Sequence, residues 1–311
     1  MRVAITGSTG LIGSALTRSL LADGHQVLRL TRGQAASAAS SGDGSESANW
    51  DPKAGTVQPG ALEGVEAVVH LAGAGIGDKR WNDAYKRELR DSRVLGTQTI
   101  ARAIAALDVK PRVLVSGSAV GYYGDTGDRV VDESTPAGTD FLAGLCVEWE
   151  DAAAPAAAAG IRVVHARTGL VVSAKGGAWG KLFPLFRYGL GGRLGSGNQY
   201  WPFISLTDHI AALRFAIDDE GVSGPLNFSA PEPLTNLEIT KAMGRAMHRP
   251  TIASVPEFAL KIAVGEFASG ITGSCRAVPA GLLKAGFTFT YPTIEQSLDS
   301  VLPEVARQPS S

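Results

Sequence analysis

Residues 3–13 read Val-Ala-Ile-Thr-Gly-Ser-Thr-Gly-Leu-Ile-Gly, and their pattern is the most informative in the chain. A short apolar run predicts a buried strand, and glycines in the spacing Gly-x-x-Gly-x-x-Gly lead from it into an amphipathic helix. Such glycines permit a sharp turn, close approach of the backbone to a pyrophosphate and tight helix–strand packing, while the helix N-terminus attracts the anion. This order of elements predicts a dinucleotide site rather than only a tight turn. The expected cofactor-binding residues here are Gly7, Thr9, Gly10, Leu11, Ile12 and Gly13.

Apolar runs and amphipathic segments alternate through the first half of the chain, which is typical of a parallel sheet covered on both faces. The expected strands cover residues 3–5, 26–30, a short run near Trp50, 67–71, 112–116 and 161–167. The expected helices cover residues 11–22, about 82–107 and about 140–158. The pattern predicts the α/β class, with a Rossmann doubly wound parallel sheet.

The pattern changes near residue 176, where glycines and aromatic residues cluster and prolines then divide short helices. No long polar linker separates the two parts. We therefore predict a Rossmann core over residues 1–175 and a smaller, mixed C-terminal substrate lobe over residues 176–311, with some segments returning to the core. Residues 34–48 are almost entirely Ala, Ser, Gly and acidic residues, and this composition predicts a mobile surface loop.

Composition narrows the possible partners. The 29 basic and 30 acidic residues leave a net charge of −1, which gives no electrostatic footprint for nucleic acid or an anionic membrane. The first strand begins at Arg2 and every apolar stretch is too short to span a bilayer, so we expect a cytoplasmic protein without a signal peptide. Two cysteines and five scattered histidines favour neither a disulfide framework nor a metal site. A small-molecule substrate is the expected partner, and the oligomeric state stays open.

The end of the second expected strand bears on the choice of cofactor. An NAD-specific site usually places an acid there to hold the ribose 2′-hydroxyl, but this chain has Thr31 and Arg32. A guanidinium pairs well with a 2′-phosphate, so the residues predict NADP(H), with Arg32 and Thr31 in contact with it. The alternative is a solvated arginine at the mouth of the loop.

The chain resembles a known family at several places. The glycine turn, Leu71-Ala72-Gly73, residues 93–97, Ser116-Gly117-Ser118 and Tyr122-Tyr123-Gly124 are similar to the extended short-chain dehydrogenase/reductases of the epimerase-like branch. The motifs at residues 50–52, 121–124, 149–150, 167–169, 195–197 and 279–291 resemble its atypical "epimerase family protein" group. Members of that group carry a short C-terminal domain of unknown function and are sometimes labelled cell-division inhibitors or nucleoside-diphosphate-sugar epimerases. The resemblance implies a Rossmann core that binds NADP(H), and it implies no particular substrate.

In such folds the loop after the fourth strand passes under the cofactor, so the resemblance implies contacts from Leu71, Ala72 and Gly73, although Gly73 has the alternative of merely ending a strand. It also makes Val171 a candidate contact beneath the nicotinamide, or a core residue.

The spacing of residues in the long helix near residues 82–107 predicts which of its side chains face inward. Its apolar positions form an inward stripe on which Arg93 falls and which Glu88 flanks. An unpaired buried charge is costly, so a cofactor is the expected partner of both residues. The alternative for Arg93 is an ion pair with Glu88 or Asp91 on a solvated face.

The expected catalytic residues differ from the usual set. Related dehydrogenases use a Tyr whose pKa is lowered by a Lys four residues later, but no tyrosine here has that Lys, and residues 140–150 contain neither. Ser118, Tyr122 and Tyr123 are the remaining candidates, each with the alternative of a purely structural role. A phenol without a nearby cation ionises near pH ~10 and is a poor base at neutral pH.

Two functions stay open at this point. The first is an NADP(H)-binding oxidoreductase or epimerase-like enzyme without the usual Tyr/Lys pair, in which aromatic residues of the second lobe, such as Phe183 and Phe203, line the substrate site or form core. The second is a non-catalytic NADP(H)-binding sensor or regulatory protein that acts through a partner. The missing general acid favours the second, and the retained glycine turn favours the first.

Overall fold

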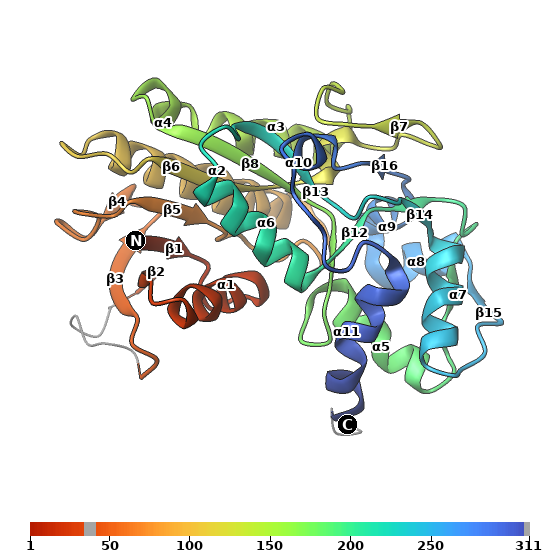
Figure 1. Ribbon diagram of the computed structural model, residues 1–311. Coiled ribbons are helices and arrows are strands. Elements are labelled where there is room, and N and C mark those ends of the chain that lie inside the picture. Colours follow the sequence, from red (N-terminus) through yellow and green to blue (C-terminus); the bar gives the residue numbers. More distant parts are fainter. Residues whose placement is uncertain (34–41, 308–311) are drawn as a thin grey trace. The chain divides into compact units, whose positions relative to one another are not determined.

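The computed structural model describes residues 1–33 and 42–307 (Figure 1). These residues form two compact units that interleave along the chain. The first unit comprises Met1–Ser118, Leu145–Ala166 and Ile210–Leu226. The second comprises Ala119–Gly144, Arg167–His209 and Asn227–Ser311. No helix within the described ranges is both long and apolar enough to span a membrane.

A large sheet carries the fold, as the alternating pattern predicts. Its eight strands follow the order β13-β8-β6-β5-β1-β2-β3-β4. The strands are β1 (Arg2–Thr6), β2 (Gln26–Thr31), β3 (Glu46–Asp51), β4 (Thr56–Val57), β5 (Ala67–His70), β6 (Val113–Ala119), β8 (Arg162–Thr168) and β13 (Gly224–Phe228). Pairs β1–β2, β1–β5, β2–β3 and β5–β6 are parallel, and β4 joins β3 in antiparallel pairing. The predicted Rossmann-like α/β fold is confirmed.

Strand order explains where the helices lie. The step from β1 to β2 runs in one direction across the sheet and the step from β5 to β6 in the other, so right-handed crossovers place their helices on opposite faces. The helices between and beside these strands are α1 (Leu11–Ala22), α2 (Asp83–Ala105), α3 (Phe141–Asp151), α4 (Ala154–Ala158) and α6 (Leu206–Asp218). The core on the α2 face joins Ile100 and Ile104 of α2, Ala156 of α4 and Leu114 of β6.

One predicted loop is partly wrong. Of residues 34–48, residues 34–41 lie outside the described part of the chain, but residues 46–48 begin β3. Glu46 pairs in register with Leu28 of β2, and the small side chain of Ala48 is buried against the core. Backbone pairing to β2 therefore overrides a composition that looks loop-like.

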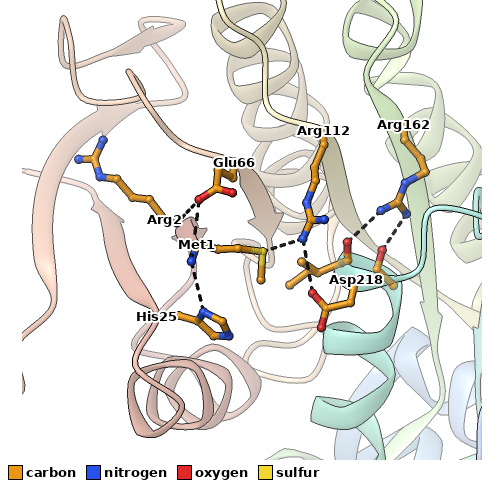
Figure 2. Close-up of polar contacts among 9 residues, drawn as sticks. Met1, Arg2, His25, Glu66, Arg112, Arg162 and Asp218 are labelled. Carbon is orange, nitrogen blue, oxygen red and sulfur yellow. Dashed lines mark hydrogen bonds and ion pairs between the residues drawn. The ribbon is translucent and has the colours of Figure 1, made fainter.

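Paired polar groups cover the edge of the sheet at which the parallel strands begin (Figure 2). The amino group of Met1 lies 3.9 Å from the Glu66 carboxylate. Arg112 and Asp218 form an ion pair at 3.5 Å. Arg162 donates to three backbone carbonyl groups, those of Ala216, Ile217 and Val222, at 2.8–2.9 Å.

The second unit has a core of its own, formed by Trp179, Phe183, Phe203, Met243 and Leu298 among others. Its strands are β7 (Val130–Val131), β9 (Leu170–Val172), β10 (Gly192–Leu194), β11 (Tyr200–Trp201), β12 (Phe203–Ser205), β14 (Leu234–Thr235), β15 (Ala253–Val255) and β16 (Arg276–Ala277). Its helices are η1 (Val120–Tyr123), α5 (Gly177–Arg187), α7 (Asn236–Ala246), α8 (Glu257–Val264), η2 (Gly265–Phe267), α9 (Ala268–Thr272), α10 (Ala280–Lys284) and α11 (Ile294–Arg307).

Candidate functional site

The carboxyl ends of four parallel strands meet at one edge of the sheet. In the register of the sheet, Thr6 of β1 is paired with Leu30 of β2 and with His70 of β5, and His70 is paired with Ser116 of β6. The segments that follow these strands therefore gather at this edge. They are the glycine turn, Thr31–Arg32, Leu71–Gly73 and Gly117–Ser118, and in open α/β sheets this is where ligands bind.

The glycine turn requires its glycines. Gly7 has a φ of +67°, and a Cβ there would lie 2.8 Å from the Leu71 carbonyl carbon. A Cβ on Gly13 would overlap the carbonyl oxygen of Gly7. The turn is closed by the Gly10 N–H, which donates to the Gly7 carbonyl at 3.0 Å. Side chains at these positions would push apart the turn, α1 and the segment that follows β5.

The N-terminus of α1 fits an anion. Gly10 is the N-cap residue and offers no side-chain cap, and the first turn contains no acidic residue. Backbone N–H groups at the start of α1, with the positive end of the helix dipole, are thus available to a pyrophosphate. Ser8 adds a buried hydroxyl for which the described residues provide no hydrogen-bond partner. Thr9 and Gly10 are exposed, and Leu11 and Ile12 are half-buried.

Thr6 and His70 fix the segment after β5 against β1. The Leu71 and Ala72 N–H groups donate to the Thr6 Oγ1 at 3.1 and 3.2 Å, and Oγ1 lies 2.8 Å from the His70 Nδ1. Two backbone N–H groups and the imidazole of His70 therefore share the Thr6 hydroxyl. The Trp50 ring packs edge-on against the imidazole, with centroids 5.8 Å apart. Burial lowers the pKa of His70 to about 4.

Thr6 and His70 were not among the predicted site residues. A histidine inside the apolar run Ala-Val-Val-His was the available signal, because a fully buried imidazole needs a hydrogen-bond partner.

Two arginines at the end of β2 have different surroundings. Arg29 forms an ion pair with Asp43. Arg32 is exposed, and within the described residues it has no ion-pair partner. Thr31 beside it is half-buried. The Arg32 guanidinium is therefore available to a ligand phosphate, and no acid occupies positions 31–33.

Arg93 lies inside the unit, as the stripe on the long helix predicts. Its Nη1 donates to the Leu89 carbonyl at 3.1 Å, and its guanidinium lies 4.9 Å from the centre of the Trp149 ring. A Cβ on Gly73 would lie 3.5 Å from its Cζ, so the guanidinium contacts the segment after β5. Burial lowers the pKa of Arg93, an effect that a bound anionic or polar group would offset.

The cofactor-binding role of Glu88 stays a prediction. Its side chain is exposed and forms an ion pair with Lys79 at 2.9 Å. Asp91 pairs with Arg90 at 3.5 Å, so neither acid forms the surface pair with Arg93 considered as the alternative. Lys79 belongs to the segment before α2, and helical spacing within α2 carries no information about it.

Ser118 lies near the carboxyl end of the buried strand β6. Its hydroxyl donates to the Glu150 Oε1 at 2.6 Å, and the serine is 4% exposed. Glu150, in α3, was not among the predicted site residues. The two residues are 32 positions apart in the chain, and spacing alone gives no signal for such a pair.

The two candidate tyrosines and Val171 belong to the second unit. Tyr123 is buried, donates to the Asn227 Oδ1 at 2.7 Å and accepts from Arg167 at 3.0 Å. Burial raises the pKa of Tyr123 to about 12, so its phenol is a weaker acid than a free one and supplies even less phenolate at neutral pH. The Tyr122 ring lies 3.4 Å from the Arg167 Cζ, and Val171 pairs with Ile204 in adjoining strands. Their catalytic and cofactor-binding roles stay predictions.

The aromatic residues expected either to line a substrate site or to form core are core. Phe183 and Phe203 are each 1% exposed within the second unit. They pack with Trp179 and Met243 in the core of this unit.

The sheet, its glycine turn and the uncapped helix behind it define a protein of the Rossmann class. Residues 3–227 match the NAD dependent epimerase/dehydratase family, and the chain belongs to this family. Residues 255–301 match a domain of unknown function, DUF1731.

Individual relatives cover nearly the whole chain. An epimerase family protein of Mycobacterium bovis is 50% identical over 297 residues, which is 95% of this chain and 96% of that protein. The crystal structure of human epimerase family protein SDR39U1 with NADPH superposes with a TM-score of 0.87 at 31% identity, covering 97% of this chain and 99% of the human one. A nucleoside-diphosphate sugar epimerase from Corynebacterium glutamicum gives a TM-score of 0.78 at 33% identity, covering all of this chain and 62% of the other.

Proposed function

We propose that this chain binds NADP(H) and is an oxidoreductase or epimerase-like enzyme acting on a small substrate. In this proposal residues 1–175 are the cofactor-binding core and residues 176–311 the substrate lobe. The observation that carries it is the uncapped, acid-free N-terminus of α1 together with Arg32 at the end of β2, which has no ion-pair partner among residues 1–33 and 42–307. The human relative solved with NADPH supports the choice of cofactor.

Each predicted contact has a distinct task in this proposal. Backbone N–H groups of the turn from Gly7 to Gly13 hold the pyrophosphate, and Arg32 holds the 2′-phosphate. Leu71–Gly73 and Arg93 border the rest of the cofactor. When bound, the nicotinamide gives or accepts a hydride, and Ser118 orients the reacting oxygen of the substrate.

A second candidate is a non-catalytic NADP(H)-binding regulatory protein. It is favoured by helix α3, which carries Phe141 and Leu145 and neither a tyrosine nor a lysine. Reduction of carbonyl compounds with NADPH separates the two candidates: the first requires turnover, and the second requires binding without it.

Replacing Arg32 tests the cofactor assignment. Arg32→Ala should weaken NADPH binding by about 1.5 to 3 kcal/mol, or about 10- to 150-fold, because a hydrogen-bonded charge pair with the 2′-phosphate is lost. NADH binding should stay nearly unchanged. Fluorescence titration with both nucleotides measures the two affinities.

Arg18→Ala is the matched control, since Arg18 is exposed on α1 and its loss changes the net charge equally. Equal losses for NADPH and NADH in Arg32→Ala, or the same NADPH loss in the control, would contradict the assignment.

A further inference from the structure

Helix α3 carries a carboxylate that the function proposed above does not yet use. The Ser118 hydroxyl donates to the Glu150 Oε1 at 2.6 Å. Because this hydrogen points to Glu150, Ser118 presents its oxygen lone pairs to any other group. A lone pair on a hydroxyl whose proton already points to a carboxylate is suited to accept a proton from an alcohol.

The contact between β6 and α3 sets this distance. A Cβ on Gly117 would lie 2.9 Å from the Trp149 Cζ2, so the tryptophan packs directly on the glycine backbone. Gly117 and Ser118 are consecutive in β6, and Trp149 and Glu150 are consecutive in α3. The glycine–tryptophan contact therefore brings the hydroxyl and the carboxylate together. The guanidinium of Arg93 also packs on Trp149, 4.9 Å from the ring centre.

We propose that Ser118 and Glu150 form a proton relay for the reaction of the proposed function, on which this inference rests. In oxidation, a substrate hydroxyl passes its proton to the Ser118 Oγ while Ser118 passes its own proton to the Glu150 Oε1. The O–H and C–H bonds of the substrate break, its C=O bond forms, and the hydride with its electron pair reduces NADP⁺. In reduction the protonated Glu150 returns the proton through Ser118 to the substrate oxygen. The substrate class is therefore an alcohol and its aldehyde or ketone.

Glu150 acts through Ser118 and is a positioning residue that also holds the proton. Other ionisable groups lie around this part of the unit: Arg93 on α2, Cys146 on α3, and the ion pair of Arg90 with Glu148 at 2.5 Å. Arg167 lies near the end of β8, the neighbour of β6 in the sheet. Reduction needs the protonated carboxyl and oxidation the ionised one, so their rates should change with pH in opposite directions. A purely structural hydrogen bond predicts neither dependence.

Turnover with a simple substrate pair gives the first test. Single-turnover rates are measured for benzaldehyde with NADPH and for benzyl alcohol with NADP⁺ across a pH series. Glu150→Gln keeps an acceptor for Ser118 but cannot take up a proton, so both rates should fall about 100-fold and lose their opposite pH slopes. NADPH affinity should stay within about twofold. Glu148→Gln, a carboxylate two positions earlier on the same helix, should keep wild-type rates and slopes.

Two Ser118 variants distinguish the effect of the hydroxyl on the rate from the effect of the side-chain shape. Ser118→Ala should lose the rate as Glu150→Gln does, while Ser118→Thr retains a hydroxyl and should keep most of it. Wild-type pH slopes in Glu150→Gln would overturn the relay.

An infrared titration of the cofactor-free protein tests the pair without turnover. One carboxyl band that changes with pH should vanish in Glu150→Gln and shift in Ser118→Ala, because its hydrogen bond is gone. A band that stays unshifted in Ser118→Ala would overturn the relay. Failure of the wild-type protein to bind NADPH would instead refute the proposed function, and it leaves this infrared result intact.

Discussion

The two edges of the parallel sheet in the first unit differ in some of their polar groups. At the edge where the strands begin, Arg112 pairs with Asp218 (Figure 2). The Arg162 guanidinium at this edge donates to three carbonyl groups. At the edge where the strands end, α1 starts without a cap and the Ser8 hydroxyl is buried with no partner in the described residues.

This difference indicates which polar groups contribute to the stability of the folded chain and which are available to bind a ligand. A polar group whose partners come from the chain adds to the free energy of unfolding, whereas one left without a partner costs energy until a ligand supplies it. Substitutions at the beginning edge should therefore lower stability and spare NADPH affinity. Substitutions of the groups that the chain leaves unpaired at the ending edge should lower NADPH affinity more than stability.

The largest effect is expected at the beginning edge. Arg162→Ala removes the donor to the carbonyl groups of Ala216, Ile217 and Val222 and should lower the free energy of unfolding by about 2 to 4 kcal/mol. NADPH affinity should not change. Urea unfolding and nucleotide titration measure the two quantities. Arg112→Ala is the control, because its exposed ion pair should contribute at most about 1 kcal/mol. A large loss of NADPH affinity in Arg162→Ala would break the comparison.

At the ending edge we expect a smaller effect, on NADPH affinity rather than on the free energy of unfolding. A methyl group on Gly13 overlaps the Gly7 carbonyl oxygen, and the displaced turn should weaken NADPH binding by about 1 to 3 kcal/mol in Gly13→Ala. Fluorescence titration gives the affinity. Gly144→Ala is a matched glycine-to-alanine change in a helix with open space around it, and it should leave binding unchanged. Equal NADPH affinities in Gly13→Ala and the wild type would show that the turn tolerates the methyl group.

The elements that could be predicted are those specified locally. The helix at Leu11–Ala22 is correct to the residue, because a glycine turn marks its start and an apolar stripe follows. The strand at Glu46–Asp51 was placed only near Trp50, because its first residues are small and polar and their strand conformation comes from pairing with β2. Local composition cannot report a partner strand that is distant in sequence.

The residues of the candidate site also include some that local sequence predicts and some whose contacts depend on distant parts of the chain. Arg93 was predicted to face inward because helical spacing fixes the face of a helix on which a residue lies. The ion pair of Glu88 could not be predicted from helical spacing, because its partner, Lys79, lies outside the helix. The Ser118–Glu150 pair was missed because it depends on the packing of α3 against β6, which needs Gly117 beneath Trp149. Only the folded chain brings those residues together.

The smallest predicted effect concerns pH and the buried His70 at the ending edge. Burial lowers its pKa from 6.5 to about 4 in the folded state. Above pH 6.5 the imidazole is neutral in both states, and its contribution to stability is fully present. As the pH falls from about 6.5 towards 4, the unfolded chain binds a proton that the folded chain does not, so stability is lost by at most about 1.4 kcal/mol per pH unit.

His70→Gln should remove this part of the pH dependence. Other acidic groups titrate in the same range, so the quantity to compare is the difference between wild type and variant in urea unfolding at pH 7 and pH 5.5. Between these values the wild type should lose about 1 kcal/mol more than the variant, because only its imidazole must stay neutral against Thr6 to keep the segment after β5 in place. Equal losses of unfolding free energy in the wild type and His70→Gln would mean that the folded protein tolerates a charged His70. The buried imidazole would then not contribute to the difference between the two edges.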